Sequence, residues 1–173
     1  MKTLLKVAGA ILACLVLLLV VLRITGVGPL GHTPGLWIKG NSVTTPVADW
    51  SFANKYQTLE IQTQTPYLLP HSVTTYFVVY QGQLYVSSSY PAGVKYPHGR
   101  TWNEDVARDP HVRIKIGSQL YNCMLVHVTD PALSAAVTQA KLARYPVLKI
   151  PPHGSNQVFH AVQIGAAEHA SGN

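Results

Sequence analysis

The sequence predicts a mainly β protein, in which a small antiparallel β-barrel with two helices follows one N-terminal membrane-spanning helix. Three observations predict this fold. An apolar run without charges opens the 173-residue chain, several short segments with strand-like patterns follow, and two segments between them begin with helix-start signals. The length fits one ordinary domain with an accessory segment.

Composition excludes several classes of protein. Hydrophobic residues make up 47% of the chain and charged residues 12%, so a disordered polar protein is excluded. The two cysteines are too few for a disulfide scaffold or a cysteine-rich zinc module. Of the net charge of +6, three units come from Lys2, Lys6 and Arg23 around the apolar run. The scattered remainder predicts no nucleic-acid partner.

Residues 1–24 are predicted to form a single-pass membrane anchor. The 16 residues between Lys6 and Arg23 carry no charge, and with apolar neighbours they approach the length that a helix needs to cross a bilayer. The alternative is a cleaved signal peptide, although no A-x-A site follows the run. Lys2 and Lys6 precede the run and only Arg23 follows it closely, which favours a domain on the non-cytoplasmic, periplasmic side.

Residues 25–46 are rich in Gly, Pro and Thr and are predicted to be a linker. They contain Gly26-x-Gly28-x-x-Gly31, the spacing of a dinucleotide-binding fingerprint. That fingerprint requires a buried strand before it and a helix after it. Here a membrane helix precedes the glycines and Pro29 interrupts them, so we reject the match.

Residues 47–165 are predicted to form the barrel domain, and residues 166–173 a flexible tail. Alternating or short apolar runs bounded by turns indicate strands. We expect strands at 58–63, 72–80, 84–88, 111–116, 119–128 and 158–164, with tight turns at 81–83 and 117–118.

Two helices are predicted between the strands. Thr101 and Glu104 have the spacing of a capping box, and that helix ends before Asp109-Pro110. The second helix starts at Asp130, with Pro131 at its first position, and extends to about residue 144. Its apolar stripe consists of Leu133, Ala136, Val137 and Ala140.

Most motifs of catalytic chemistry are absent from the sequence. It contains neither G-x-S-x-G nor H-E-x-x-H, and its eight histidines include no close pair at metal-ligand spacing. His127 and His160 fall on predicted strands, where separate structural roles are favoured over a shared metal. We predict no metal site and assign no catalytic residue.

Residues 87–113 are the segment richest in polar groups. Three serines end a strand, a Gly/Pro loop carries Lys95, His98 and Arg100, and a helix start follows. Hydroxyls, a cation and free helix N–H groups are what a phosphate requires. A polar hairpin end with a solvated loop is the alternative, and on physical grounds alone it is favoured.

The spacing across 102–112, the sequence Val128-Thr129-Asp130-Pro131 and the helix end at 144–146 resemble the split β-barrel flavin- and deazaflavin-binding family. This family includes the pyridoxamine-phosphate-oxidase-like proteins and the deazaflavin-dependent nitroreductases. The similarity covers about residues 58–145, and 49–52 resembles uncharacterised membrane-anchored relatives. It implies a split β-barrel, a homodimer, and an FMN or deazaflavin cofactor.

The resemblance also implies the cofactor contacts. By position they fall to Ser87, Ser88, Ser89, Lys95, Arg100, Trp102, His71 and Ser72. Two positions depart from the family pattern. The loop at 65–72 offers no cation except His71, and Asp105 stands where the family usually has Asn.

Two principal functions follow. One is an oxidoreductase that passes a hydride from FMN or deazaflavin to a small organic acceptor. The other is a non-catalytic barrel at the membrane that binds a small-molecule ligand, such as haem through His71 or His98, or a partner protein. A structural subunit of a membrane complex is a third hypothesis.

Overall fold

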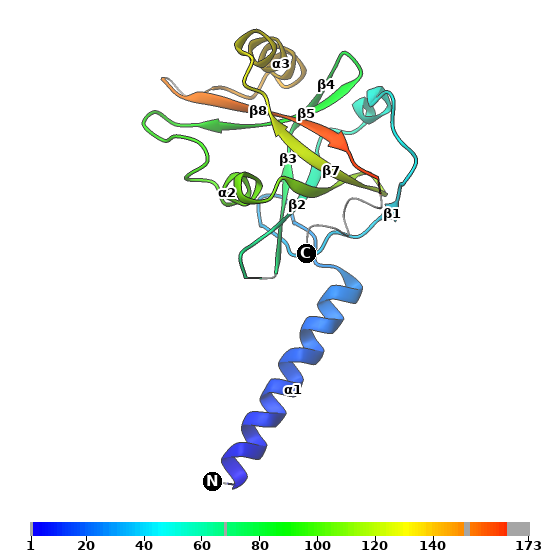
Figure 1. Cartoon of the computed structure of the whole chain (residues 1–173), viewed down its shortest axis with the longest axis vertical. Coiled ribbons are helices and arrows are strands. Elements are labelled where there is room, and N and C mark those ends of the chain that lie inside the picture. Colours follow the sequence, from blue (N-terminus) through cyan, green and yellow to red (C-terminus); the bar gives the residue numbers. More distant parts are fainter. Residues whose placement is uncertain (1, 68, 151–152, 166–173) are drawn as a thin grey trace.

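The computed structural model describes residues 2–67, 69–150 and 153–165, which form one long helix and one β-rich domain (Figure 1). The helix, α1 (Lys2–Thr25), projects from the domain. The remaining elements are β1 (Asn41–Ser42), the short 3-10 helix η1 (Ser51–Lys55), β2 (Leu59–Gln64), β3 (Pro70–Thr75), β4 (Phe77–Tyr80), β5 (Gln83–Tyr90), α2 (Thr101–Arg108), β6 (His111–Ile116), β7 (Gln119–His127), α3 (Pro131–Arg144) and β8 (Ser155–Gln163).

The helix α1 is long and apolar enough to cross a membrane, as the charge-free run predicted. None of its residues is buried against the domain. Gly26 ends the helix in the left-handed conformation (φ 77°), and its N–H donates to the Leu22 carbonyl at 2.9 Å. The apolar surface of α1 is therefore left without a protein partner among the described residues.

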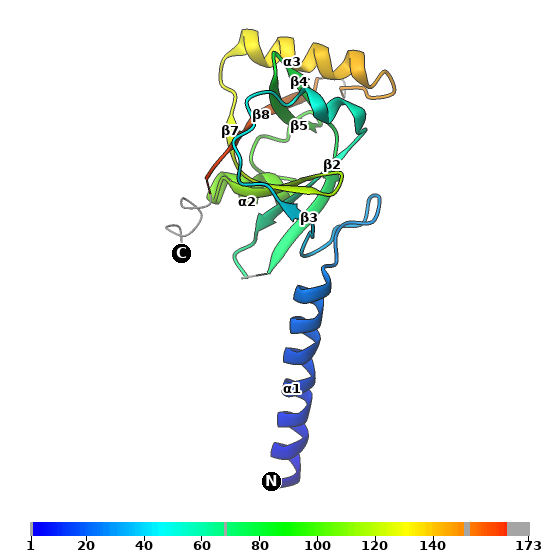
Figure 2. The same cartoon turned by 90° about the vertical axis from the view of Figure 1, so that its right-hand side faces the viewer.

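The strands form one curled, antiparallel sheet in the order β3-β2-β6-β7-β8-β5-β4, and β1 joins β7 in parallel (Figure 2). Alternate residues face the interior of the curl. Ile61, Ile114 and Phe159 are fully buried there. A second apolar layer lies between the sheet and α3, where Val137 packs on Val158. The predicted barrel with two helices is thus confirmed.

One predicted strand is wrong. The pattern at 72–80 predicted a single strand, but the structure has two, β3 and β4, separated at Tyr76. β3 pairs with β2 and β4 pairs with β5, so the two lie at opposite ends of the strand order. The chain crosses between the two edges of the curled sheet at this residue. The run of β-branched and aromatic residues continues through the break, which is why the sequence pattern did not reveal it.

The predicted turn between β4 and β5 is confirmed. Gln81 (φ 51°) and Gly82 (φ 75°) both adopt positive φ, which is the type I′ geometry that matches the twist of two hairpin strands. The strands predicted at 58–63, 84–88, 111–116, 119–128 and 158–164 correspond to β2, β5, β6, β7 and β8.

Of the two predicted helix starts, one is confirmed and the other is wrong in its capping. Asp130 caps α3 as predicted, since its carboxylate accepts the Ala132 N–H at 2.9 Å. The capping box of α2 is wrong. Arg100 is the N-cap, and Glu104 accepts the Gly99 N–H at 3.0 Å instead of the Thr101 N–H. Because Thr101 already has helical conformation, its hydroxyl makes no capping bond.

Part of the Gly/Pro-rich stretch after α1 packs on the barrel. Trp37 and Ile38 are buried, and the Ile38 N–H donates to the Gln62 side chain at 2.9 Å. Further along, Trp50 is almost fully buried, with its ring 4.9 Å from that of Tyr121. These contacts fix the path of the chain from α1 to the first barrel strand.

Candidate functional site

A pocket of about 400 Å³ lies where β5, the start of α2 and α3 meet. Five of the predicted cofactor-binding residues line it. They are Ser87, Ser88, Ser89, Arg100 and Trp102. Residues 31–34, from the segment after α1, and residues 148–150, which follow α3, form other parts of the wall.

The three serines reach the pocket from two faces of β5. Ser88 follows Leu84 and Val86 on the face toward the barrel interior, and its hydroxyl accepts a hydrogen bond from the Asn103 amide at 2.9 Å. Ser87 lies on the other face, toward α3, and is also buried. Ser89 donates to the Asn156 side chain at 3.3 Å. Along β5 the apolar side chains of residues 84–86 are therefore followed by three hydroxyl groups near the end of the strand.

Lys141 of α3 is a pocket residue that the sequence analysis missed. Its ammonium donates to the Ser87 hydroxyl at 2.6 Å and lies 3.4 Å from the Ser87 carbonyl oxygen. The side chain is only 9% exposed, and burial lowers the pKa of Lys141 to about 8. The signal was present in the sequence, because Lys141 follows Val137 by four residues and so shares the helix face that packs on the sheet.

Arg100 places a second cation at the pocket. Its guanidinium donates to the Ser89 carbonyl at 3.1 Å, and its own carbonyl accepts the N–H groups of Asn103 and Glu104. The adjacent Trp102 is buried, with its ring 5.6 Å from that of Phe159 in an edge-to-face arrangement. The start of α2, the Arg100 guanidinium and the Trp102 ring thus lie together at one end of β5.

The charge of the pocket wall is positive. Arg100, Lys141 and Lys149 line it, and none of the described lining residues is Asp or Glu. With serine hydroxyls between the cations, the arrangement suits an anionic group such as a phosphate. It lacks the carboxylates that a cationic ligand would require.

Three predicted residues do not line this pocket. Lys95 is exposed in the loop between β5 and α2. His71 and Ser72 lie on β3, where Ser72 exchanges two backbone hydrogen bonds with Gly35. His98, the other histidine considered for haem, is also outside the pocket wall, and its side chain is 80% exposed.

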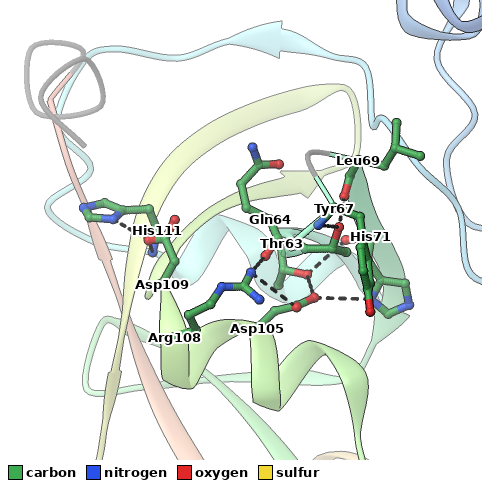
Figure 3. A network of polar contacts seen from close by, with 10 residues as sticks. Thr63, Gln64, Tyr67, Leu69, His71, Asp105, Arg108, Asp109 and His111 are labelled. Atoms are coloured by element: carbon green, nitrogen blue, oxygen red, sulfur yellow. Dashed lines mark hydrogen bonds and ion pairs between the residues drawn. The ribbon is translucent and has the colours of Figure 1, made fainter. Parts of the chain in front are cut away.

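The buried carboxylate of Asp105 belongs to a different network (Figure 3). It accepts the Thr63 hydroxyl at 2.7 Å and lies 3.5 Å from the Arg108 guanidinium and 4.0 Å from the His71 ring. These contacts attach α2 to β2 and β3. Asp105 therefore does not line the serine pocket, and Asn103 is the α2 residue that faces Ser88.

His127 of β7 and His160 of β8 each form a hydrogen bond with an amide side chain. His127 lies 2.8 Å from Gln157, and His160 lies 3.1 Å from Gln83. Within the described ranges, no group of three or more His, Cys, Asp or Glu side chains is close enough to hold a metal ion.

Comparison with known proteins bears on the fold. No family model matches the chain, and no curated protein does either. Among solved structures, an F420 reductase superposes with a TM-score of 0.51 at 15% identity, covering 70% of this chain and 97% of the reductase. The domain is a split β-barrel.

Two other solved structures are similar to the chain at lower TM-scores. A pyridoxamine 5′-phosphate oxidase-like protein from Listeria innocua has a TM-score of 0.49 at 18% identity, covering 65% of this chain and 88% of that one. HutZ, the haem storage protein from Vibrio cholerae, has a TM-score of 0.47 at 15% identity, covering 66% and 87%. The observed sheet and the match to the F420 reductase confirm the fold predicted from the family resemblance. Identities this low show the fold alone, so the activity has to be argued from the site.

Proposed function

We propose that the serine pocket binds the phosphate end of an FMN or deazaflavin cofactor, and that the protein is a membrane-anchored oxidoreductase acting on a small organic molecule. The observation that carries the proposal is the pocket wall, in which three serines lie among Arg100, Lys141 and Lys149 and none of the described lining residues is acidic. The name of the F420 reductase neighbour agrees with a cofactor of this class.

The residues present fit a phosphorylated cofactor. Arg100 offers a planar donor fork for two phosphate oxygens, and the buried Lys141 offers a point charge in the same wall. Ser88 and Ser89 add hydroxyl donors once they exchange their present partners for the anion. The volume of about 400 Å³ lies within the range of small-molecule pockets.

The rest of the wall suits a flat apolar ring. Trp102, Tyr76, Leu142, Leu148 and Ile150 contribute aromatic and aliphatic surface that excludes water from that part of the pocket. When bound, a reduced flavin or deazaflavin supplies two electrons and one proton as a hydride to the acceptor, whose second proton comes from solvent. The chain itself would bind the phosphate, orient the cofactor ring and exclude water from the pocket.

We further propose that α1 is an uncleaved single-pass anchor with the barrel on the non-cytoplasmic side, and that two chains form a homodimer. The length and composition of α1 and the positive charges before it support the anchor. Leu30 and Val147 are 81% and 82% exposed next to residues of the pocket wall, which supports a dimer that covers them.

The test uses the full chain, purified in a mild detergent. FMN or a deazaflavin is added, free cofactor is removed by gel filtration, and the visible absorption spectrum is recorded. We expect a flavin-type band to be retained, and Arg100→Ala to lower retention at least about tenfold, because a hydrogen bond to a charged group is lost. The retained cofactor is then reduced with dithionite, and its reoxidation by a nitroaromatic acceptor is followed.

Lys95→Ala is the matched control, because this cation of the same loop does not line the pocket. It should retain cofactor like the unaltered chain. If Arg100→Ala retains cofactor fully, the assigned site is wrong. A Soret band after haem addition, with no retention of flavin or deazaflavin, would replace the oxidoreductase by a haem-binding barrel.

A further inference from the structure

A second pocket, of about 260 Å³, lies at the junction between α1 and the barrel. Three cations from three segments line it. Arg23 comes from the last turn of α1, Lys39 from the segment that leads to the barrel, and Arg113 from β6. Among the described residues, this pocket shares no lining residue with the serine pocket.

Local structure explains why these cations meet. Gly26 ends α1 in a left-handed conformation and leaves room for the Lys39 side chain, with which a methyl group at position 26 would collide. Arg113 lies opposite Gln62 in the pairing of β6 with β2, and the Gln62 side chain accepts a hydrogen bond from the Ile38 N–H. The segment before Lys39 is thereby held against the sheet beside Arg113.

The carboxylates near this pocket, within the part of the chain that the structure describes, are paired with other groups. Glu60 pairs with Lys115 at 3.0 Å, and Asp109 lies 2.7 Å from His111. The third acid close to this pocket, Asp105, pairs with Arg108 and lies behind Thr63.

Across the described ranges, Arg23, Lys39 and Arg113 take part in no ion pair, and no Asp or Glu lines the pocket. Burial, together with the positive charge of Arg23, lowers the pKa of Arg113 from its ordinary value. An anion between these cations would relieve their mutual repulsion.

The place of the pocket along the chain indicates the source of that anion. Arg23 is the first charged residue after the 16-residue apolar run, so it lies where a spanning helix leaves the hydrocarbon layer. Figures 1 and 2 show the barrel beginning directly at this end of α1. Trp37, a residue type enriched at membrane interfaces, forms part of the same wall. Lipid headgroups lie at this level and are far more concentrated there than free phosphate.

We propose that Arg23, Lys39 and Arg113 bind the phosphate of an anionic phospholipid headgroup, which fixes the barrel against the membrane surface. The inference rests on the membrane anchoring in the proposed function, and it is independent of cofactor binding. Each cation near an anionic membrane surface contributes about a fivefold change in affinity.

The experiment uses the full chain in nanodiscs of phosphatidylcholine, with or without phosphatidylglycerol, and measures melting temperature together with the lipids retained in native mass spectrometry. We expect phosphatidylglycerol to raise the melting temperature and to be retained preferentially. Arg113→Gln and, separately, the more exposed Lys39→Gln should each weaken retention about fivefold. Lys55→Gln, which removes an exposed cation outside the pocket, is the matched control and should change nothing.

Three outcomes would overturn the inference. One is retention of phosphatidylglycerol by both pocket variants at the level of the control. Another is the same stabilisation by inorganic phosphate in phosphatidylcholine discs, which would assign the pocket to a free anion. The last is a mature chain that has lost α1, as its intact mass would show. Cofactor absorbance, measured on the same samples, distinguishes failure of the lipid site from failure of the oxidoreductase proposal.

Discussion

Replacing Lys141 by Met should stabilise the protein while weakening the candidate site. The pKa of Lys141 falls from 10.5 to about 8 because the side chain is buried, and this difference corresponds to about 3 kcal/mol of destabilisation when the amine is charged. Met has a similar length and no charge. Loss of the 2.6 Å hydrogen bond to Ser87 offsets about 1 kcal/mol of the gain. The net gain near neutral pH is about 2 kcal/mol, or about 6 °C in melting temperature.

The pH dependence of this effect has a definite sign. The folded-state pKa lies below the unfolded-state value, so between about pH 8 and pH 10.5 the unfolded chain holds more protons at this site. The stability of the unaltered protein therefore rises with pH across that window. Below about pH 8 the full destabilisation by the charged Lys141 is present. At about pH 9.5 roughly 2 kcal/mol is recovered, and the advantage of Lys141→Met nearly disappears.

Thermal unfolding of both full-length proteins in the same detergent, at about pH 7 and about pH 9.5, measures the effect. Taking the difference between the two proteins cancels the contributions of other titrating groups, such as the buried thiol of Cys123. A constant difference at the two pH values would refute the reasoning, because the burial of a charged amine would then not be its origin. A less stable Lys141→Met protein near pH 7 would refute it equally.

Three further predictions concern the site and the fold. Anion affinity should fall as pH rises above about 8, by up to tenfold per unit, because a bound anion favours charged Lys141; titration of Lys141→Met with FMN should show no such fall. Asp130→Ala should lower the melting temperature by about 3 °C, since the cap on the Ala132 N–H contributes about 1 kcal/mol. Cys123, buried and with its pKa raised to about 12 by that burial, should react with maleimide only after denaturation. The measurement uses a Cys14→Ser chain, because Cys14 is exposed, and rapid labelling of that folded chain would contradict the position of Cys123.

Local signals predicted the elements whose causes are local. The alternation at 111–116 places Val112, Ile114 and Ile116 on one face, and these residues are buried in β6. Asp130 followed by Pro131 predicted the start of α3, because capping involves only neighbouring residues. The apolar run predicted α1 for the same reason.

Other features depended on long-range pairing, which the sequence does not encode locally. The break at Tyr76 arises because β3 and β4 pair with different strands, although the apolar pattern continues through it. The pocket was predicted only in part. Ser88 and Arg100 stand in one polar segment, whereas Lys141 reaches the pocket from a helix 41 residues further along the chain than Arg100. Only the packing of α3 on the sheet brings these groups together.

The two pockets share one physical feature, which is a cation held in surroundings that disfavour its charge. Lys141 and Arg113 both have lowered pKa values because of burial, and neither pocket wall contains a carboxylate among its described residues. A buried charge that stabilised the fold would be expected to have an acidic partner, since an unpaired charge is destabilising. Perturbed titratable groups in concave sites are more typical of binding than of architecture. The same deficit of negative charge therefore favours an anionic ligand in each place, a cofactor phosphate beside β5 and a lipid phosphate at the end of α1.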